Sequence, residues 1–398
     1  MKKSGNSPRD SKAAVLSAAR WLVRSGIQSA SKDLKRSGGV AAWYEPDKKR
    51  YPFLYSEITG YALSTWVFAN RIHPSAEFLK AANQAAGWLV KNALYKDGGV
   101  KTRFYLVKRY VSPNYCFHYG RVYAFDAAMV GYGLLQLFKV SKKEEHLRAA
   151  ERVLQFLTTK MMKKGGSFYP YFDSSTQKCG EDLDKWSDQE GSFHGKLALF
   201  FTDYYRLTGI EKYRQITFNL LDGIKKQQKS AGRFITGKKD GSTHLHPHSY
   251  TLEGLLYAGI LLKRPDYCQA ALKGFLWMVR GVSTDGSVSS ILEKNKFSRH
   301  ERSDIVAQFL RIGSILYTLY PKKISAHLET LESVKKHLLL FQNKDASRQS
   351  GGFLYGAATD GLMRPHLNAW ATQFALQALW MHDEFVLRRR PVCVESFV

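Results

Sequence analysis

Two kinds of hydrophobic segment alternate along the chain. The first kind is amphipathic: in residues 76–94, apolar side chains recur at positions i, i+3, i+4 and i+7, and Lys and Glu occupy the opposite face. This pattern predicts helices with one face in water. We expect six of them, at 11–26, 76–94, 144–161, 211–228, 267–281 and 325–341.

The segments between these helices are almost entirely apolar or small. Residues 124–135, for example, contain one charged side chain, Asp126. A helix that is apolar all round is buried on every side. We expect six such helices, at 56–70, 121–138, 190–207, 249–262, 302–319 and 367–383. Six buried helices that alternate with six amphipathic ones predict a closed double ring, with the buried helices inside.

A glycine followed by an extended apolar or aromatic segment supports this repeat. Its six copies begin at Gly38, Gly98, Gly165, Gly232, Gly286 and Gly351. Their spacing of roughly 54 to 67 residues fits one helical hairpin and a loop. Each copy follows an amphipathic stretch, so we expect each glycine at the left-handed C-cap of an outer helix.

The predicted fold is therefore an all-α (α/α)6 toroid of six helical hairpins, with short β ribbons at one end. We expect a flexible N-terminus at 1–10, a single toroid domain at 11–384 and a basic C-terminal tail at 385–398. A chain of 398 residues is long for one ordinary domain, but a repeated unit distributes its core around a ring.

The polar residues of the inner helices concentrate where these helices begin. In such a ring the inner helices run parallel, so their N-termini, with free backbone N–H groups and positive dipole ends, open on one face. We call this face the rim. The acid–base candidates there are Glu57, Asp126, Glu190, His194, Glu253 and Asp304. The substrate-binding candidates are Tyr55, His118, Tyr119, Arg121, Trp186, Lys196, His246, His248, Tyr250, Arg302, Gln308, Arg364, Asn368, Trp370 and Gln373.

This mixture of side chains suits a sugar. Aromatic faces cover the apolar side of a pyranose, planar polar groups bind its hydroxyls, and carboxylates supply acid–base chemistry. Structural roles stay open for several of these residues. Glu57, Glu190 and Asp304 lie in first helical turns, where an acid favours the helix dipole in any case. Asp126 and Glu253 interrupt apolar helices, so each either serves chemistry or pairs with a neighbouring cation.

Metal binding is disfavoured by the sequence. His244, His246 and His248 alternate, but Pro247 intervenes and no Cys partner accompanies them. We expect neither a metal nor a cofactor.

The charge changes the expected substrate. Lys and Arg number 60 against 34 Asp and Glu, a net charge of +26, which attracts polyanions. The basic residues are spread along the chain, without a zinc-finger, RNP or homeodomain pattern, so dedicated nucleic-acid binding is not indicated. We expect an acidic oligo- or polysaccharide as partner, with peripheral contact with an anionic membrane as an alternative.

The remaining signals favour a cytoplasmic protein. No apolar run precedes Ala13, which argues against a secretory signal, and no stretch reaches the ~18 apolar residues of a membrane span. The four Cys residues show no CxxC spacing and are best interpreted as reduced thiols.

Three inner-helix openings carry a resemblance to known proteins. They are 55–61 (YSEITGY), 191–199 (GSFHGKLAL) and 368–379 (NAWATQFALQAL). In them the chain resembles six-hairpin glycosidase-like proteins found with bacterial polysaccharide-biosynthesis genes, over about residues 11 to 384. The resemblance implies an (α/α)6 toroid and carbohydrate substrates. That superfamily includes hydrolases, uronate lyases and sugar epimerases, so the resemblance leaves the reaction open.

Two mechanisms fit an acidic glycan or glycan precursor. In a hydrolase, one carboxylic acid protonates the glycosidic oxygen while a second carboxylate activates water or attacks carbon. The candidates are Glu57, Asp126, Glu190, Glu253 and Asp304. In a lyase or C5-epimerase, a Tyr or His removes the proton beside a uronate carboxylate that Arg or Asn holds. The candidates are Tyr55, Tyr119, His194, His248 and Tyr250, with Arg121 and Arg302.

Two other classes of protein compete with these mechanisms. A non-catalytic glycan-binding or scaffold protein of a biosynthetic complex would have an aromatic rim without two carboxylates at working separation. A terpene cyclase or prenyltransferase would need an acid cluster inside the barrel. The only similar run is 181–184 (EDLD), which lies ahead of a helix.

Overall fold

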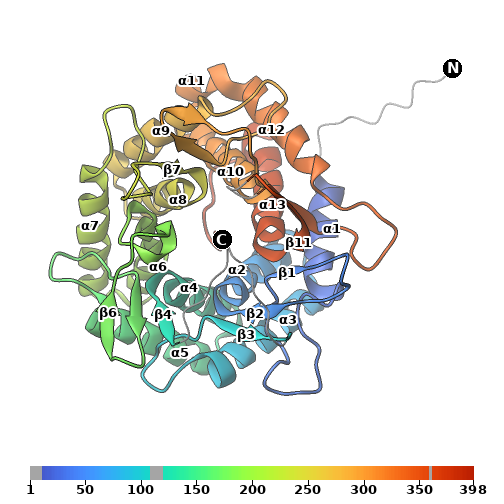
Figure 1. The fold of residues 1–398 in the computed structure, drawn as a ribbon, viewed down its shortest axis with the longest axis vertical. Helices are drawn as coiled ribbons and strands as arrows, with labels where there is room; N and C mark the ends of the chain where they lie inside the picture. The colour runs from blue at the N-terminus through green and yellow to red at the C-terminus, as the bar shows by residue number, and fades with distance from the viewer. Residues whose placement is uncertain (1–10, 108–119, 358–360) are drawn as a thin grey trace.

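The computed structural model describes residues 11–107, 120–357 and 361–398, and in them two concentric rings of helices surround the centre of the molecule (Figure 1). The inner ring consists of α2 (Ser56–Ile72), α4 (Ala124–Ser141), α6 (Ala198–Thr208) with the preceding 3₁₀ helix η5 (Ser192–Leu197), α8 (Leu245–Leu261), α10 (Ser303–Leu319) and α13 (Ala369–Met381). The outer ring consists of α1 (Lys12–Arg24), α3 (Ala76–Trp88), α5 (Glu144–Phe156), α7 (Glu211–Lys226), α9 (Pro265–Val279) and α12 (Leu328–Leu340). The predicted (α/α)6 toroid is confirmed.

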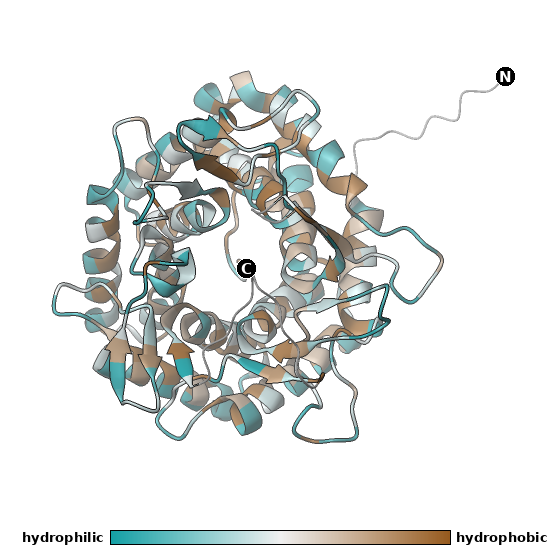
Figure 2. Ribbon diagram, in the orientation of Figure 1, coloured by the Kyte–Doolittle hydropathy of each residue, from teal (hydrophilic) through white to brown (hydrophobic). Residues whose placement is uncertain are grey.

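Burial explains why the two rings differ in sequence. In α4 every residue from Ala124 to Leu137 is buried, because outer helices and neighbouring inner helices cover it on all sides. In α5 the buried side chains include Ala149, Ala150, Val153 and Leu154, which form one stripe. Figure 2 shows polar residues along the outward faces of the outer helices.

One inner helix begins earlier than the sequence predicts. We expected the fourth inner helix from residue 249, but α8 begins at Leu245. Pro247 therefore lies in the first helical turn, where its missing N–H costs nothing because that position has no intrahelical acceptor. The earlier start places His246 and His248 on the helix itself.

The six repeated glycines lie in turns rather than at helix C-caps, so this expectation was wrong. The outer helix α3 continues into a π-helical turn, η1 (Leu89–Ala93), and Gly98 follows in a turn between the bridged residues Leu94 and Val100, with φ +94°. A Cβ on Gly98 would lie 2.1 Å from the carbonyl oxygen of Arg152 in α5, the next outer helix. The turn therefore packs directly on the neighbouring hairpin.

The same contact recurs around the ring and closes it. A Cβ on Gly38, Gly232 or Gly286 would lie 2.3 to 2.4 Å from a carbonyl oxygen of the next outer helix. In the third copy the residue with positive φ is Gly166 rather than Gly165. In the last copy, Gly351 approaches the carbonyl oxygen of Ser17 in α1, with 2.3 Å to an added Cβ. The final hairpin thus packs on the first.

Short antiparallel ribbons precede most inner helices, as expected. The strand β2 (Phe53–Tyr55) pairs with β3 (Arg103–Tyr105), and β4 (Arg121–Tyr123) pairs with β5 (Tyr171–Asp173), which also pairs with β6 (Lys178–Gly180). The strand β7 (Thr243–His244) pairs with β8 (Ile291–Glu293), which pairs with β9 (Lys296–Phe297). The strand β11 (Met363–Asn368) lies between β1 (Trp43–Tyr44) and β10 (Phe353–Ala357). Because β2, β4, β7 and β11 run directly into inner helices, the ribbons fix where the rim begins.

The C-terminal residues return into the inner ring. The boundary expected after 384 falls inside a π-helical segment, η7 (His382–Leu387), that continues α13. Beyond it, Val394, Phe397 and Val398 are buried, and Figure 1 shows the C-terminus at the centre of the ring. These three residues lie near the C-terminal ends of the inner helices, away from the rim. The expected flexible segment 1–10 lies outside the described residues, and none of the described helices is long and apolar enough to cross a membrane.

Candidate active site

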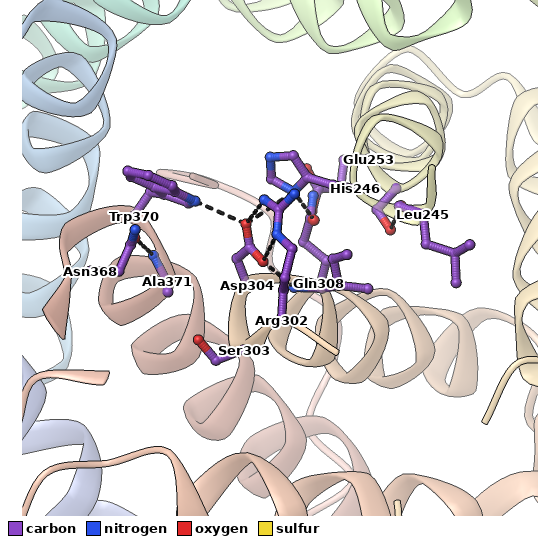
Figure 3. Close-up of polar contacts among 12 residues, drawn as sticks. Leu245, His246, Glu253, Arg302, Ser303, Asp304, Gln308, Asn368, Trp370 and Ala371 are labelled. Carbon is purple, nitrogen blue, oxygen red and sulfur yellow. Dashed lines mark hydrogen bonds and ion pairs between the residues drawn. The ribbon is translucent and has the colours of Figure 1, made fainter. Parts of the chain in front are cut away.

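A buried aspartate organises one side of the rim (Figure 3). Asp304, in the first turn of α10, accepts hydrogen bonds from Nε of Arg302 (3.1 Å) and from Nε1 of Trp370 (2.9 Å). Nδ1 of His246 lies 3.5 Å from its Oδ2. Burial raises the pKa of Asp304, but Arg302 and His246 outweigh burial and lower the pKa below its usual value. Asp304 therefore stays ionised and orients its neighbours.

His246 has the geometry of a general base. Its Nδ1 lies 2.7 Å from Oε1 of Gln308, whose Nε2 donates to Oε1 of Glu253 (3.3 Å). This second bond fixes the amide orientation, so Nδ1 of His246 must carry the hydrogen. Burial lowers the pKa of His246 to about 4, which leaves the ring neutral at pH 7. The hydrogen bond that the His246 ring makes within the described part of the chain uses Nδ1, so Nε2 is available to accept a proton.

Below His246 lies a buried group of three charges. Glu253 of α8 binds Nζ of Lys196 at 2.8 Å and also binds the guanidinium of Arg311. All three side chains are fully buried. Burial lowers the pKa of Lys196 to about 8, and Nζ lies over the rings of Tyr250 (4.5 Å) and Phe374 (4.9 Å). Two cations against one anion leave a positive centre, which would stabilise negative charge on a substrate.

Glu57 and Asp126 are buried in the first turns of α2 and α4. These two helices lie across the ring from α8 (Figure 1). Burial, and then the charge of Glu57, raises the pKa of Asp126 well above its usual value. Burial also raises the pKa of Glu57, opposed by a hydrogen bond from Tyr55 and by the charge of Lys196. The negative charge of Glu57 disfavours ionisation of Asp126, so Asp126 keeps its proton to a higher pH than an exposed carboxyl does. Such a carboxyl can act as a proton donor.

Aromatic side chains surround these groups. The ring of Tyr250 lies 4.4 Å from that of His246 and 4.7 Å from that of Phe125. The Trp186 ring lies 6.0 Å from His246. Such flat apolar faces suit the carbon face of a pyranose.

Other expected site residues have structural partners. Oδ1 of Asn368 caps α13 by accepting from the backbone N of Ala371 (2.9 Å), and Nε2 of Gln373 binds the carbonyl of Ile58 (3.4 Å). The guanidinium of Arg121 pairs with Asp182 at 2.7 Å. Arg364 is half-buried on β11, and its Nη1 lies 3.4 Å from the carbonyl oxygen of Leu362.

Three expected site residues lie apart from the cluster around His246. Glu190 is partly exposed and pairs with Lys163, and the pKa of this carboxyl is lowered, with burial opposing the effect of Lys163. Burial lowers the pKa of His194 to about 3, and neither ring nitrogen has a hydrogen-bond partner among the described residues. His248 faces the outer helix α9, where its ring lies 5.0 Å from that of Trp277. His118 and Tyr119 lie outside the described residues.

The structure adds residues that the sequence analysis missed. Arg103 reaches the rim because β3 pairs with β2, with Arg103 opposite Tyr55, and its guanidinium lies 5.1 Å from the Tyr55 ring. Arg311 follows Asp304 and Gln308 on one face of α10, a helical spacing visible in the sequence. His366 on β11 stacks between the rings of Trp43 (4.6 Å) and Tyr355 (5.0 Å).

Metal ligation finds no support in the described part of the chain. Within residues 11–107, 120–357 and 361–398, no three His, Cys, Asp or Glu side chains come together in a way that could hold a metal ion.

Comparison with known proteins identifies the fold. No protein-family model matches the chain, and no curated protein matches it. Among solved structures, the cellobiose 2-epimerase from Bacillus thermoamylovorans has a TM-score of 0.72 at 15% identity, covering 93% of this chain and 99% of that one. A D-mannose isomerase has a TM-score of 0.75 at 12% identity, covering 98% and 100%. An unsaturated glucuronyl hydrolase from a Bacillus species has a TM-score of 0.67 at 11% identity, covering 95% and 97%. At these identities the similarity establishes the six-hairpin (α/α)6 fold, and the activity has to be argued from the site.

Proposed function

We propose that this chain is a carbohydrate-active enzyme that transfers a proton at a sugar carbon, as an epimerase or lyase acting on a uronate-containing glycan. The observation that carries the proposal is the neutral, buried His246, with Nδ1 held by Gln308 and Nε2 free to accept a proton. A neutral imidazole held in one tautomer is suited to act as a general base.

The proton transfer can be written in balanced steps. Nε2 of His246 takes the proton from the carbon beside the uronate carboxylate, and the electron pair of the broken C–H bond moves onto that carboxylate. The positive centre of Lys196, Arg311 and Glu253 would stabilise the resulting enediolate. Return of a proton to the opposite face, from Glu57 or Asp126 across the ring, gives the epimer. In a lyase, the electron pair of the enediolate instead forms a C=C bond to the neighbouring carbon, whose C–O bond to the glycosidic oxygen breaks, and the leaving oxygen takes a proton from Glu57 or Asp126.

An acidic substrate is supported by charge at two scales. The chain carries a net charge of +26, and the buried group beneath the rim has one more cation than anions. The epimerase and isomerase named above act on other sugars by their names, whereas the glucuronyl hydrolase is named for a uronate. Neutral disaccharides therefore belong in the same assay as uronate oligosaccharides.

Hydrolysis is the second candidate, favoured by the raised pKa values of Glu57 and Asp126. Either carboxyl could protonate a leaving oxygen. However, glycosidases hold their two carboxyls about 5 to 9.5 Å apart on either side of the scissile bond, whereas Glu57 and Asp126 lie in the first turns of two helices that pack together, α2 and α4. The other buried carboxylates, Glu253 and Asp304, are each neutralised by cations. Proton transfer at carbon therefore fits the site better. A non-catalytic glycan-binding protein would not need two buried carboxyls with raised pKa values.

Incubation with uronate oligosaccharides in D2O, followed by NMR, tests this proposal. An epimerase or lyase introduces solvent deuterium or forms a double bond at the carbon beside the carboxylate. New reducing ends without deuterium would show hydrolysis, and binding without any product would show a glycan-binding protein. Activity only on neutral sugars would contradict the uronate assignment.

The variant His246→Gln should lower the rate of this reaction by about 100-fold or more, because it removes the general base. The matched control is His248→Gln. That ring is buried two residues away on the same helix but faces α9, so its loss should lower the melting temperature and leave the rate of the folded protein near wild type. Equal losses of rate in the two variants would contradict the role of His246.

A further inference from the structure

The C-terminal residues contact the buried charges beneath the rim. The ring of Phe397 lies 4.4 Å from the guanidinium carbon of Arg311, and Phe374 of α13 lies 4.7 Å from it. Arg311 is thus sandwiched between a ring of the inner barrel and a ring of the C-terminal segment. Stacking of this kind holds a planar guanidinium in one orientation.

One glutamine joins the same arginine to the chain end. Oε1 of Gln377 in α13 accepts from Nη1 of Arg311 (3.1 Å) and from the backbone N of Val398 (3.1 Å). Its Nε2 donates to the carbonyl of Ser396 (2.6 Å). Residues 396–398 therefore act on the position of Arg311 in two ways, directly through the Phe397 ring and indirectly through Gln377.

From Arg311 the polar contacts continue without a gap to His246. The guanidinium binds Oε1 of Glu253, the same oxygen accepts from Nε2 of Gln308, and Oε1 of Gln308 holds Nδ1 of His246. The side chains of Arg311, Glu253 and Gln308 are fully buried. In a water-excluded network, each group has few other partners, so a change at one end alters the next bond.

We propose that residues 394–398 are a positioning element of the active site, in which Phe397 holds Arg311 and thereby sets the orientation and the protonated nitrogen of His246. This inference rests on the proposed role of His246 as general base. It assigns to a segment far from the rim a role in the chemistry that takes place there.

The surroundings of the segment explain why Phe397 would matter. Its ring is one of the two that stack on the guanidinium of Arg311, and the other belongs to Phe374. Without the Phe397 ring, one face of the guanidinium would lose its packing. The guanidinium would then hold Glu253 less firmly, and Gln308 would lose its fixed acceptor. The side-chain amide of Gln308 could then flip. Either nitrogen of His246 could then carry the hydrogen.

We call the series of contacts from Phe397 through Arg311, Glu253 and Gln308 to His246 the relay. NMR of protein labelled with ¹⁵N-histidine tests it without any substrate. The signals of His246 are identified by their loss in His246→Gln. In the wild type we expect the tautomer with hydrogen on Nδ1 alone. In Phe397→Ala we expect the two nitrogen shifts of His246 to move towards each other, as the tautomers interconvert, and the pH at which the ring titrates to rise. Phe397→Tyr, which keeps the ring, should restore the wild-type shifts.

Phe385→Ala is the matched control for loss of a buried ring. Phe385 in η7 is as buried as Phe397 and packs against Trp380 (5.9 Å), with no ring contact to Arg311. We expect it to lower the melting temperature and to leave the His246 signals unchanged. Wild-type His246 signals in folded Phe397→Ala, or equal shifts in both variants, would overturn the proposal.

Kinetic measurements distinguish a failure of the relay from a failure of the proposed function. If the wild type turns over a sugar, Phe397→Ala should lower kcat by about 10- to 100-fold with a small change in KM, because a base displaced by about 1 Å loses rate rather than affinity. Phe385→Ala should keep kcat. If the wild type turns over no sugar, the proposed function fails while the NMR result still decides the relay. Unchanged kcat and unchanged His246 signals in Phe397→Ala would refute the relay alone.

Discussion

At the scale of single residues, charge compensation decides which buried carboxyl can take part in acid–base chemistry. Asp304 is held by Arg302 and Glu253 by Lys196 and Arg311, and both have a lowered pKa despite burial. Asp126 has a raised pKa because burial and Glu57 dominate there. The first two carboxylates position other groups, and Asp126 can carry a proton.

This difference predicts that two similar substitutions lower the free energy of unfolding by unequal amounts. Asp304→Asn removes the buried anion that pairs with Arg302 and should cost about 3 to 5 kcal/mol. Asp126→Asn replaces a carboxyl whose charged form is already disfavoured by burial and by Glu57, and it should cost about 1 kcal/mol or less. Urea unfolding monitored by circular dichroism at pH 7 measures both. A larger loss in Asp126→Asn than in Asp304→Asn would contradict the assigned protonation states.

Several residues of the candidate site could be proposed from the sequence, because an unpaired polar side chain in an apolar helix is costly. His246, Glu253, Asp304 and Gln308 belong to this group, and the structure brings them together. Arg103 could not be found in this way, because it reaches the rim through strand pairing. The sequence also could not show that Lys163 neutralises Glu190, since that contact depends on the path of a loop.

At the scale of elements, the repeated glycine turns are what allow one hairpin to pack on the next. The helices themselves were predictable because their apolar positions follow a 3.6-residue period. The role of the glycines was not, because the contact that requires them is with the next outer helix, which lies about 40 to 55 residues later in the chain or, for Gly351, at its beginning.

Substitution of one such glycine should therefore be costly. Gly98→Ala combines a positive φ of +94° with a Cβ 2.1 Å from a carbonyl oxygen, so we expect a loss of about 2 kcal/mol or more in unfolding free energy. Gly87→Ala is the control. That residue lies within α3, with nothing within 4 Å of an added Cβ, so the change should raise stability by about 0.5 to 1 kcal/mol. Chemical denaturation measures both, and similar values would refute the packing role of the turn.

At the scale of the whole molecule, buried histidines predict a marked loss of stability in acid. Burial lowers the pKa of His244, His246 and His248 to about 4 and that of His194 and His366 to about 3. These rings are neutral when folded and gain protons on unfolding, so their contribution is present above pH 6.5 and is lost as the pH falls towards 4. Glu57 and Asp126, with raised pKa values, act in the opposite direction.

The histidines outnumber these two carboxyls. The free energy of unfolding should therefore fall with decreasing pH more steeply than the about 1.4 kcal/mol per pH unit expected of one histidine. Urea unfolding midpoints between pH 7 and about pH 5 measure the slope. A stability that stays constant over this interval would show that these rings are not neutral and buried.

The central claim is that chemistry takes place at the rim of the inner ring, beside His246. A crystal structure of His246→Gln soaked with a uronate oligosaccharide tests it most directly, because the variant can bind substrate without consuming it. The account predicts a uronate residue at the rim, with the carbon beside its carboxylate about 3 to 3.5 Å from the position of Nε2 and its carboxylate towards Lys196. An oligosaccharide bound elsewhere, with the rim empty, would contradict it.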